Sequence, residues 1–187
     1  MKVFWFVAAA VALGVMIFYG RILFKRVLFS ARLKKACRAG KYGFLPTHAF
    51  WLLGWTRGKK CDFYIEKPEG IYAVKLIGAL SRTALFNYIN EWHYAVRDLT
   101  FHTRYVSMGI RSSDLKAKSK SKYDFIGALP EAMRGKEIIP AIVMVPVSCF
   151  VTCSHDGEMK PISDGDKIAE GTFYTGSGFI NDVLLKK

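Results

Sequence analysis

The feature that most constrains this chain is an uncharged run near its start, which is followed directly by a block of basic residues. Residues 3–20 read VFWFVAAAVALGVMIFYG and contain no charged side chain. If the side chain of Arg21 extends toward lipid headgroups, the apolar residues at 22–24 lengthen the run to about what is needed to cross a bilayer. We therefore expect residues 1–24 to form a transmembrane helix.

Two other interpretations of this run are a cleaved signal peptide and a buried core helix. A signal peptide normally ends in small residues at its cleavage site. Here the run ends in Met16, Ile17, Phe18 and Tyr19, which are bulky, and basic residues follow at once. The sequence therefore favours a retained membrane helix over a cleaved leader.

The distribution of charge along the chain predicts the orientation of that helix. The formal charge is +13, yet residues 1–61 contain twelve Lys and Arg and no acidic residue, whereas residues 62–187 contain sixteen basic and fifteen acidic residues. A uniformly basic nucleic-acid-binding protein is therefore a poor description. Positive residues resist translocation, and most of those near the run lie on its C-terminal side. We expect a single-pass membrane protein whose C-terminal domain is cytoplasmic.

Residues 25–56 are predicted to form a basic juxtamembrane and interfacial segment. Apolar residues between positions 22 and 38 recur at spacings of three and four, which is typical of an amphipathic helix. Its basic side chains are expected to bind anionic lipid headgroups, with a nucleic-acid backbone as the less favoured partner. A second apolar patch at 44–55 fits either an interfacial position or a first core helix. The predicted membrane-surface residues are Arg21, Lys25, Arg26, Arg32, Lys34, Lys35, Arg38 and Lys41.

Residues 57–187 are predicted to form a cytosolic α/β or α+β domain with a mixed sheet. Alternating polarity at 61–66 and the apolar run at 71–77 predict a β-hairpin. The segments 83–89 and 91–99 continue this pattern, as two strands or as one long bent strand. A short helix is expected at 178–185.

The uncharged run at 138–153 decides the topology of this domain. It is rich in β-branched residues and contains Pro140 and Pro146. These features favour one or two buried strands over a second membrane span, with Pro146 at a bulge or a strand end.

Asp62 on the first strand of the hairpin and Lys75 in the middle of the second form the one constellation with a chemical interpretation. With the predicted element order, this arrangement resembles the restriction-endonuclease-like family, including its nuclease-related membrane-associated branch. In that family an Asp on one strand and a Glu-x-Lys on the next gather a divalent metal and a water around a phosphodiester. The resemblance implies Asp62 and Lys75 as catalytic residues and Mg²⁺ as cofactor. Ala73 stands at the Glu position, which implies a degenerate and inactive site. The alternative is a cross-strand ion pair between Asp62 and Lys75 on a solvated face.

Other clusters indicate no cofactor. Cys149, Cys153 and His155 could supply three zinc ligands, but a structural zinc site needs a fourth, so no metal site is expected. The chain has no phosphate-binding glycine loop and no dinucleotide fingerprint. The sequence therefore predicts a membrane-anchored, non-catalytic domain that binds or scaffolds a protein partner. The alternative is a degenerate nuclease-like domain that acts on nucleic acid.

Overall fold

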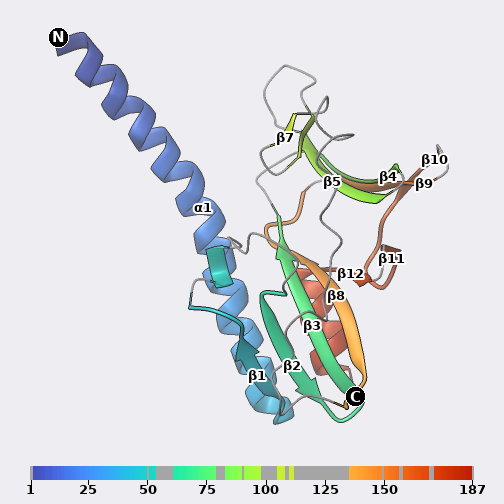
Figure 1. The fold of residues 1–187 in the computed structure, drawn as a ribbon. Coiled ribbons are helices and arrows are strands. Elements are labelled where there is room, and N and C mark those ends of the chain that lie inside the picture. Colours follow the sequence, from blue (N-terminus) through green and yellow to red (C-terminus); the bar gives the residue numbers. More distant parts are fainter. Residues whose placement is uncertain are drawn as a thin grey trace.

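The protein is a mixed α/β fold in which a long N-terminal helix lies against a six-stranded mixed sheet, as a computed structural model of the chain shows (Figure 1). The mixed-sheet prediction is confirmed at this level. The structure describes residues 2–49, 51–53, 61–78, 83–89, 91–97, 105–107, 110–111, 135–148, 150–155, 158–168 and 171–186.

The N-terminal helix, α1 (Lys2–Gly40), is continuous over 39 residues, but its two halves lie in different surroundings. The first half extends away from the rest of the molecule, whereas the second half runs along the sheet (Figure 1). Among the residues that the structure describes, no helix has both the length and the apolarity needed to cross a membrane. Large apolar side chains exposed along the first half are Trp5, Val7, Leu13, Met16, Ile17, Tyr19 and Phe24.

The main sheet has the strand order β1-β2-β3-β8-β12-β11. Its centre is parallel, because β8 pairs in parallel with both β3 and β12. The outer strands are antiparallel to their neighbours. The strands are β1 (Gly43–Pro46), β2 (Phe63–Lys67), β3 (Gly70–Ile77), β8 (Ile138–Met144), β11 (Lys167–Ile168) and β12 (Gly171–Thr175).

Two helical elements cover one face of the main sheet, which we call the helix-covered face. They are the second half of α1 and the C-terminal helical segment made of α2 (Gly176–Gly178) and η4 (Phe179–Leu185). Alternation along the strands decides which side chains meet them. Residues packed in this core include Phe29, Leu33, Cys37, Phe63, Ile65, Val74, Leu76, Phe179 and Val183. On the opposite face a second cluster contains Cys61, Tyr64, Ile71, Ala73, Ile77, Ile142, Met144 and Phe173.

A second sheet has the strand order β10-β9-β4-β5-β6-β7. The segments at 83–89 and 91–97 are two antiparallel strands, which resolves the alternative left open by the sequence. The strands are β4 (Thr83–Ile89), β5 (Glu91–Arg97), β6 (Tyr105–Ser107), β7 (Ile110–Arg111), β9 (Phe150–His155) and β10 (Glu158–Pro161).

The uncharged run at 138–153 forms β8 and the beginning of β9, and the prediction of a buried strand is confirmed for β8, which is buried from Ala141 to Met144. Pro146 lies just after the end of β8, as expected for a residue without a backbone N–H. Pro140 has no backbone N–H to donate. It lies opposite Ala73 of β3, and pairing with β12 begins only at Ala141, so the missing N–H removes no hydrogen bond to β12. The hairpin at 61–77 and the C-terminal helix are also found where they were expected.

The folded unit begins earlier than the predicted boundary at residue 57. The helix α1 contributes Phe29 and Leu33 to the core, and β1 forms an edge of the main sheet. The short 3-10 helix η1 (Trp51–Leu53) places Trp51 in the same core, with its ring centroid 5.0 Å from that of Phe63. The described part of the segment at 25–56 is therefore part of the domain rather than a separate interfacial element.

Candidate functional site

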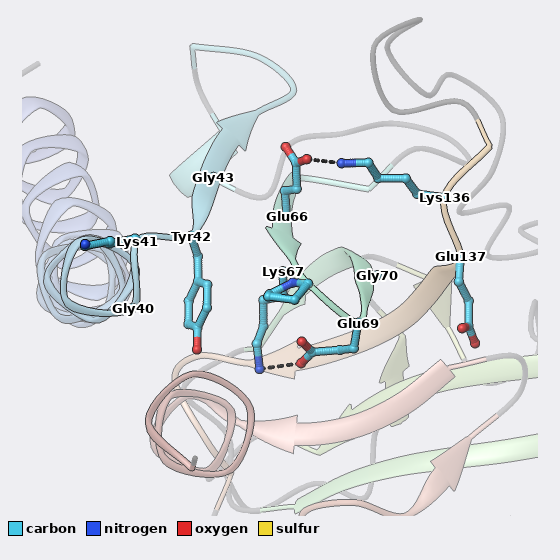
Figure 2. Close-up of a pocket in the computed structure, with 11 residues that line it drawn as sticks. Gly40, Lys41, Tyr42, Gly43, Glu66, Lys67, Glu69, Gly70, Lys136 and Glu137 are labelled. Atoms are coloured by element: carbon cyan, nitrogen blue, oxygen red, sulfur yellow. Dashed lines mark hydrogen bonds and ion pairs between the residues drawn. The ribbon is translucent and has the colours of Figure 1, made fainter.

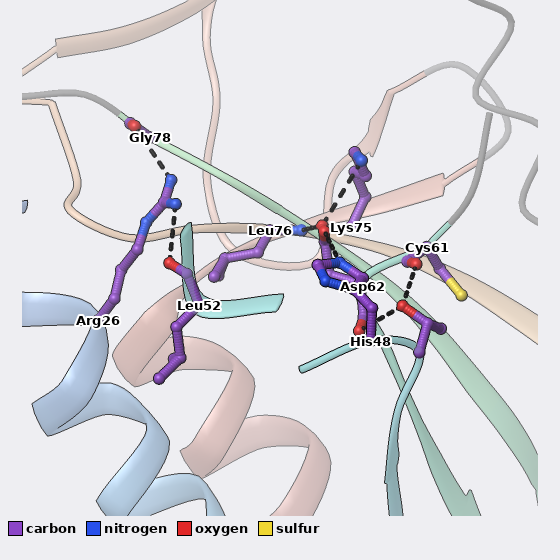
Figure 3. Close-up of polar contacts among 9 residues, drawn as sticks. Arg26, His48, Leu52, Cys61, Asp62, Lys75, Leu76 and Gly78 are labelled. Atoms are coloured by element: carbon purple, nitrogen blue, oxygen red, sulfur yellow. Dashed lines mark hydrogen bonds and ion pairs between the residues drawn. The ribbon is translucent and has the colours of Figure 1, made fainter. Parts of the chain in front are cut away.

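The β2–β3 hairpin brings Asp62 and Lys75 together, as the sequence predicted (Figure 3). The paired register ends at Phe63 opposite Val74, so the residues next along each strand are Asp62 and Lys75. The Lys75 Nζ lies 3.6 Å from Asp62 Oδ2. The other carboxylate oxygen of Asp62, Oδ1, lies 3.8 Å from His48 Nε2.

The surroundings of this pair differ from the solvated face that the cross-strand interpretation assumed. Asp62 is 0% exposed and Lys75 is 8% exposed. The carboxylate of Asp62 accepts a 2.7 Å hydrogen bond from the backbone N–H of Leu76. Because an unpaired carboxylate is costly to bury, this bond and the Lys75 ammonium together make the buried position tolerable. The carboxylate is thus an acceptor that extends the β2–β3 ladder beyond its last paired residue.

Thr47 fixes the chain where it enters β2. Its backbone N–H donates to Asp62 O at 3.0 Å, and its hydroxyl lies 2.9 Å from the carbonyl oxygens of both Cys61 and Asp62. His48 follows directly, which explains why its ring reaches the carboxylate. The His48 Nε2 atom is itself buried and has no hydrogen-bond partner among the described atoms. Sequence reasoning missed His48, because nothing local indicated that residues 47 and 62 are neighbours.

The donor set around Asp62 does not fit a magnesium ion. Mg²⁺ prefers several oxygen ligands in octahedral geometry, but Asp62 is next to an ammonium and an imidazole. Ala73, at the position of the missing Glu, is 0% exposed and packs in the apolar cluster of the opposite face. Within the described ranges, no group of three or more His, Cys, Asp or Glu is arranged to hold a metal. The groups around Asp62 and Lys75 therefore do not match the magnesium site that the resemblance implied.

The cysteines that the structure describes are also poor nucleophiles. Burial raises the pKa of the Cys61 thiol to about 11, although its hydrogen bond with Tyr64 acts in the opposite direction. Burial likewise raises the pKa of Cys37 to about 11. Since the thiolate is the reactive form, both side chains remain protonated and unreactive near neutral pH. The side chains of Cys149, Cys153 and His155, at which the sequence predicts no zinc site, are not among those that the structure describes.

Arg26 occupies a different position from the one predicted for it. Its side chain is buried, with 5% exposure, where α1 meets the end of the main sheet (Figure 3). Its Nε donates to Val145 O at 2.9 Å, while the two terminal nitrogens donate to Leu52 O at 3.0 Å and to Gly78 O at 3.3 Å. Val145 follows β8, Leu52 lies within η1, and Gly78 follows β3. One guanidinium thus ties α1 to three chain segments, and it is not available at a membrane surface.

A helical-wheel signal for the burial of Arg26 was present in the sequence. Arg26, Phe29, Leu33 and Cys37 recur at spacings of three and four and share one helix face, which is the face that packs on the sheet. The other predicted membrane-surface residues are exposed, and they are Arg21, Lys25, Arg32, Lys34, Lys35, Arg38 and Lys41.

Gly78 is required at the Arg26 junction for conformational and steric reasons. Its φ is +135°, a region that favours glycine. A Cβ there would lie 2.6 Å from Pro146 O. The absence of a side chain lets the end of β3 approach the end of β8 closely enough for both carbonyls to reach one guanidinium.

A polar pocket of about 660 Å³ lies at the turn between β2 and β3 (Figure 2), and we call it the hairpin-end pocket. Its lining comes from the end of α1 with the start of β1, from the hairpin turn and from the residues before β8. The charged residues in this lining are Lys41, Glu66, Lys67, Glu69, Lys136 and Glu137.

Most charges of the hairpin-end pocket are paired. Lys67 Nζ lies 2.5 Å from Glu69 Oε1 and donates to Val183 O at 2.5 Å. The hydrogen bond from Lys67 lowers the pKa of the Glu69 carboxyl. Lys136 pairs with Glu66. Among the residues that the structure describes, Lys41 and Glu137 have no ion-pair partner, so one charge of each sign remains available to a ligand or a partner.

Comparisons of the chain with protein-family models, with curated protein sequences and with solved structures find no match.

Proposed function

We propose that this protein is a single-pass membrane protein whose N-terminal helix holds an α/β domain at the cytosolic side of the bilayer, where the domain binds a protein partner. The observation that carries the proposal is the contrast within α1. Its second half is packed in the domain core, whereas its first half presents large exposed apolar side chains such as Leu13, Met16 and Ile17.

The free-energy argument for a bilayer rests on those exposed side chains. Trp5 is 69% exposed, Met16 is 64% exposed and Phe24 is 64% exposed. Removing apolar surface from water stabilises by about 25 cal/mol per Å², so a helix with many such side chains strongly favours an apolar environment. The length of the uncharged run supports the same environment, because residues 3–20 are eighteen consecutive residues without a charge, close to the length of about 20 residues that a membrane-spanning helix needs.

Binding is favoured over catalysis by the state of the candidate chemical groups. The Asp62 carboxylate is closed off by Leu76 N–H and by Lys75, and the thiols of Cys37 and Cys61 are protonated. The hairpin-end pocket lies at the end of the main sheet that is farthest from the exposed half of α1 (Figure 1). With the helix in a bilayer, this pocket faces the cytosol and offers a polar surface to a partner.

Membrane insertion is tested by placing a charge in each half of α1. Leu13→Arg puts a charge at the middle of the uncharged run, at a cost of about 3 kcal/mol in a bilayer. We expect the wild-type chain to remain in the membrane pellet after alkaline extraction and Leu13→Arg to be partly released. The matched control is Ala31→Arg, at an exposed position of the packed half, and it should stay in the pellet. Release of the wild-type chain by alkaline buffer would contradict insertion.

The orientation and the binding role are tested on the full chain in its membrane. Protease should digest the domain in inside-out vesicles and spare it in right-side-out vesicles; the reverse pattern excludes a cytosolic domain. A photo-crosslinking residue at Glu137, in the hairpin-end pocket, should form a discrete adduct that the same residue at Lys34 does not form. Identical adducts from both positions would argue against a binding site in this pocket.

A further inference from the structure

A small pocket of about 290 Å³ lies where α1 leaves the main sheet, and we call it the junction pocket. Its walls come from α1, from the segment after β8 and from the start of α2. Two of its side chains are basic, Lys25 and Arg32, and no acidic residue is part of its lining. Its other walls include Leu28, Val145, Val147 and Ser177.

The two basic side chains of the junction pocket are poised for an anion. Lys25 and Arg32 are seven residues apart, or about two helical turns, so they lie on one side of α1. Both are exposed, and within the described part of the chain neither forms an ion pair. The exposed hydroxyl of Ser177, which lies 3.3 Å from Thr175 Oγ1, is part of the same lining. The ammonium of Lys25 and the guanidinium of Arg32 are the donor types that bind phosphate oxygens.

The surface next to this pocket combines apolar and basic side chains. A hollow of about 480 Å³ runs along α1 between Ile17 and Lys25 and is lined by Ile17, Gly20, Arg21 and Phe24 as well. Lys25 belongs to both hollows, so the basic pocket and the apolar surface are continuous. Val147, at the rim of the junction pocket, is 45% exposed and adds apolar surface to this rim.

We propose that the junction pocket binds the phosphate headgroup of an anionic phospholipid. Lys25 and Arg32 contact the phosphate, and the acyl chains lie along Ile17 and Phe24. This proposal rests on the proposed insertion of α1, and it adds a discrete lipid site to the general attraction between basic residues and anionic membranes. A nucleic-acid backbone would satisfy the two cations, but it would leave the adjoining apolar surface exposed.

The decisive comparison uses two double variants of equal charge. Lys25→Gln with Arg32→Gln removes two positive charges from the junction pocket. Lys34→Gln with Lys35→Gln removes two exposed charges from the same helix, and neither residue is part of the pocket lining. The full-length chain and both variants are placed in nanodiscs of phosphatidylcholine containing a minor fraction of phosphatidic acid. Native mass spectrometry then measures how much phosphatidic acid stays bound to the released protein.

We expect the wild-type chain and the Lys34/Lys35 variant to retain phosphatidic acid, and the Lys25/Arg32 variant to retain it at least about tenfold less. An equal loss in both variants, or no preference for phosphatidic acid over phosphatidylcholine, overturns the proposal. So does displacement of the bound lipid by a short single-stranded oligonucleotide. Failure to enter nanodiscs at all would instead contradict the proposed membrane insertion.

A second variant tests the pocket without removing its charges, in case the Lys25/Arg32 variant fails to fold. Ser177→Trp fills the junction pocket and leaves Lys25 and Arg32 in place. It should also lower phosphatidic acid retention, while Ser163→Trp, at an exposed position outside the pocket lining, should not. Retention unchanged by Ser177→Trp would place the bound lipid elsewhere and would overturn the assignment to this pocket.

Discussion

The two halves of α1 belong to one continuous helix, but their apolar side chains lie in different surroundings. In the second half, Phe29, Leu33 and Cys37 form a stripe that packs on the sheet, and the exposed positions between them are largely basic. In the first half, apolar side chains such as Leu13 and Met16 are more than half exposed. The same residue types therefore stabilise the fold in one half, and in the other they leave a surface that water solvates poorly.

The largest expected difference between the halves comes from truncating a leucine in each. Leu33→Ala should lower the free energy of unfolding of the domain by about 2–5 kcal/mol, because Leu33 is 0% exposed and its loss leaves a cavity. Leu13→Ala should leave it unchanged, since Leu13 is 55% exposed. Denaturant unfolding in mild detergent measures both. Equal destabilisation by the two variants would erase the distinction between the halves.

The next largest effect is expected at the charge that anchors the packed half. Arg26→Gln should destabilise the domain by about 2–3 kcal/mol, because it removes donors to buried carbonyls of Val145 and Gly78. Lys34→Gln is the matched control, as it removes an exposed positive charge from the same helix, and it should change stability by less than about 0.5 kcal/mol. If Arg26→Gln left the free energy of unfolding unchanged, these hydrogen bonds would contribute little to the packing of α1 on the sheet.

A glycine-to-alanine pair tests the packing difference with a single methyl group. At Gly176 an added Cβ would lie 2.6 Å from Val145 Cγ2 and 3.1 Å from Phe29 Cδ2, so Gly176→Ala should cost about 1–2 kcal/mol through overpacking. At Gly14, in the exposed half, nothing lies within 4 Å of an added Cβ. Gly14→Ala should therefore leave domain unfolding unaltered and raise helicity slightly. Thermal melts followed by circular dichroism report both effects, and a stabilised Gly176→Ala would contradict the close approach.

The smallest expected effect is a pH dependence at the end of the packed half, in the hairpin-end pocket. The pKa of Glu69 is lowered by its hydrogen bond from Lys67. A carboxyl with a lowered folded-state pKa stabilises the fold above its unfolded-state pKa, and this contribution is lost as pH falls through the folded-state pKa. Because the side chain is 47% exposed, we expect a few tenths of a kcal/mol. The difference in unfolding free energy between wild type and Glu69→Gln should be present near pH 7 and vanish at about pH 3. A difference that persists at low pH would exclude this pairing as its cause.

Local pattern was enough to predict many elements of the fold. The hairpin that contains Asp62 and Lys75, the strand at 138–144 and the C-terminal helix all follow from short-range periodicity and from proline and glycine positions. Such signals are local because alternation and helical spacing depend on neighbouring residues alone. The segment at 25–56, which was predicted to be separate from the domain, contributes to the core. Periodicity shows that a helix has an apolar face, but whether this face packs on protein or on lipid depends on strands far away in the sequence.

The candidate site was predictable in its pairing but not in its environment. Register alone brings Asp62 beside Lys75, and this follows from the hairpin. That His48 lies next to the buried carboxylate depends on the neighbouring Thr47, which contacts the backbone carbonyls of Cys61 and Asp62 before β2. Nothing within either strand could indicate that contact.

The order of residues along the chain decides its charge asymmetry and the uncharged run at 3–20, because both are properties of neighbouring residues. It also decides the hairpin, whose strands are joined by a short turn. Helical spacing puts Arg26 on the same face of α1 as Phe29 and Leu33, but only the tertiary structure makes this face the buried one and leaves Lys25 exposed at a pocket. The physical reason is distance along the chain: the carbonyl that accepts from Arg26 Nε belongs to Val145, 119 residues away. A basic residue becomes a structural tie or a surface charge according to what the rest of the chain places beside it.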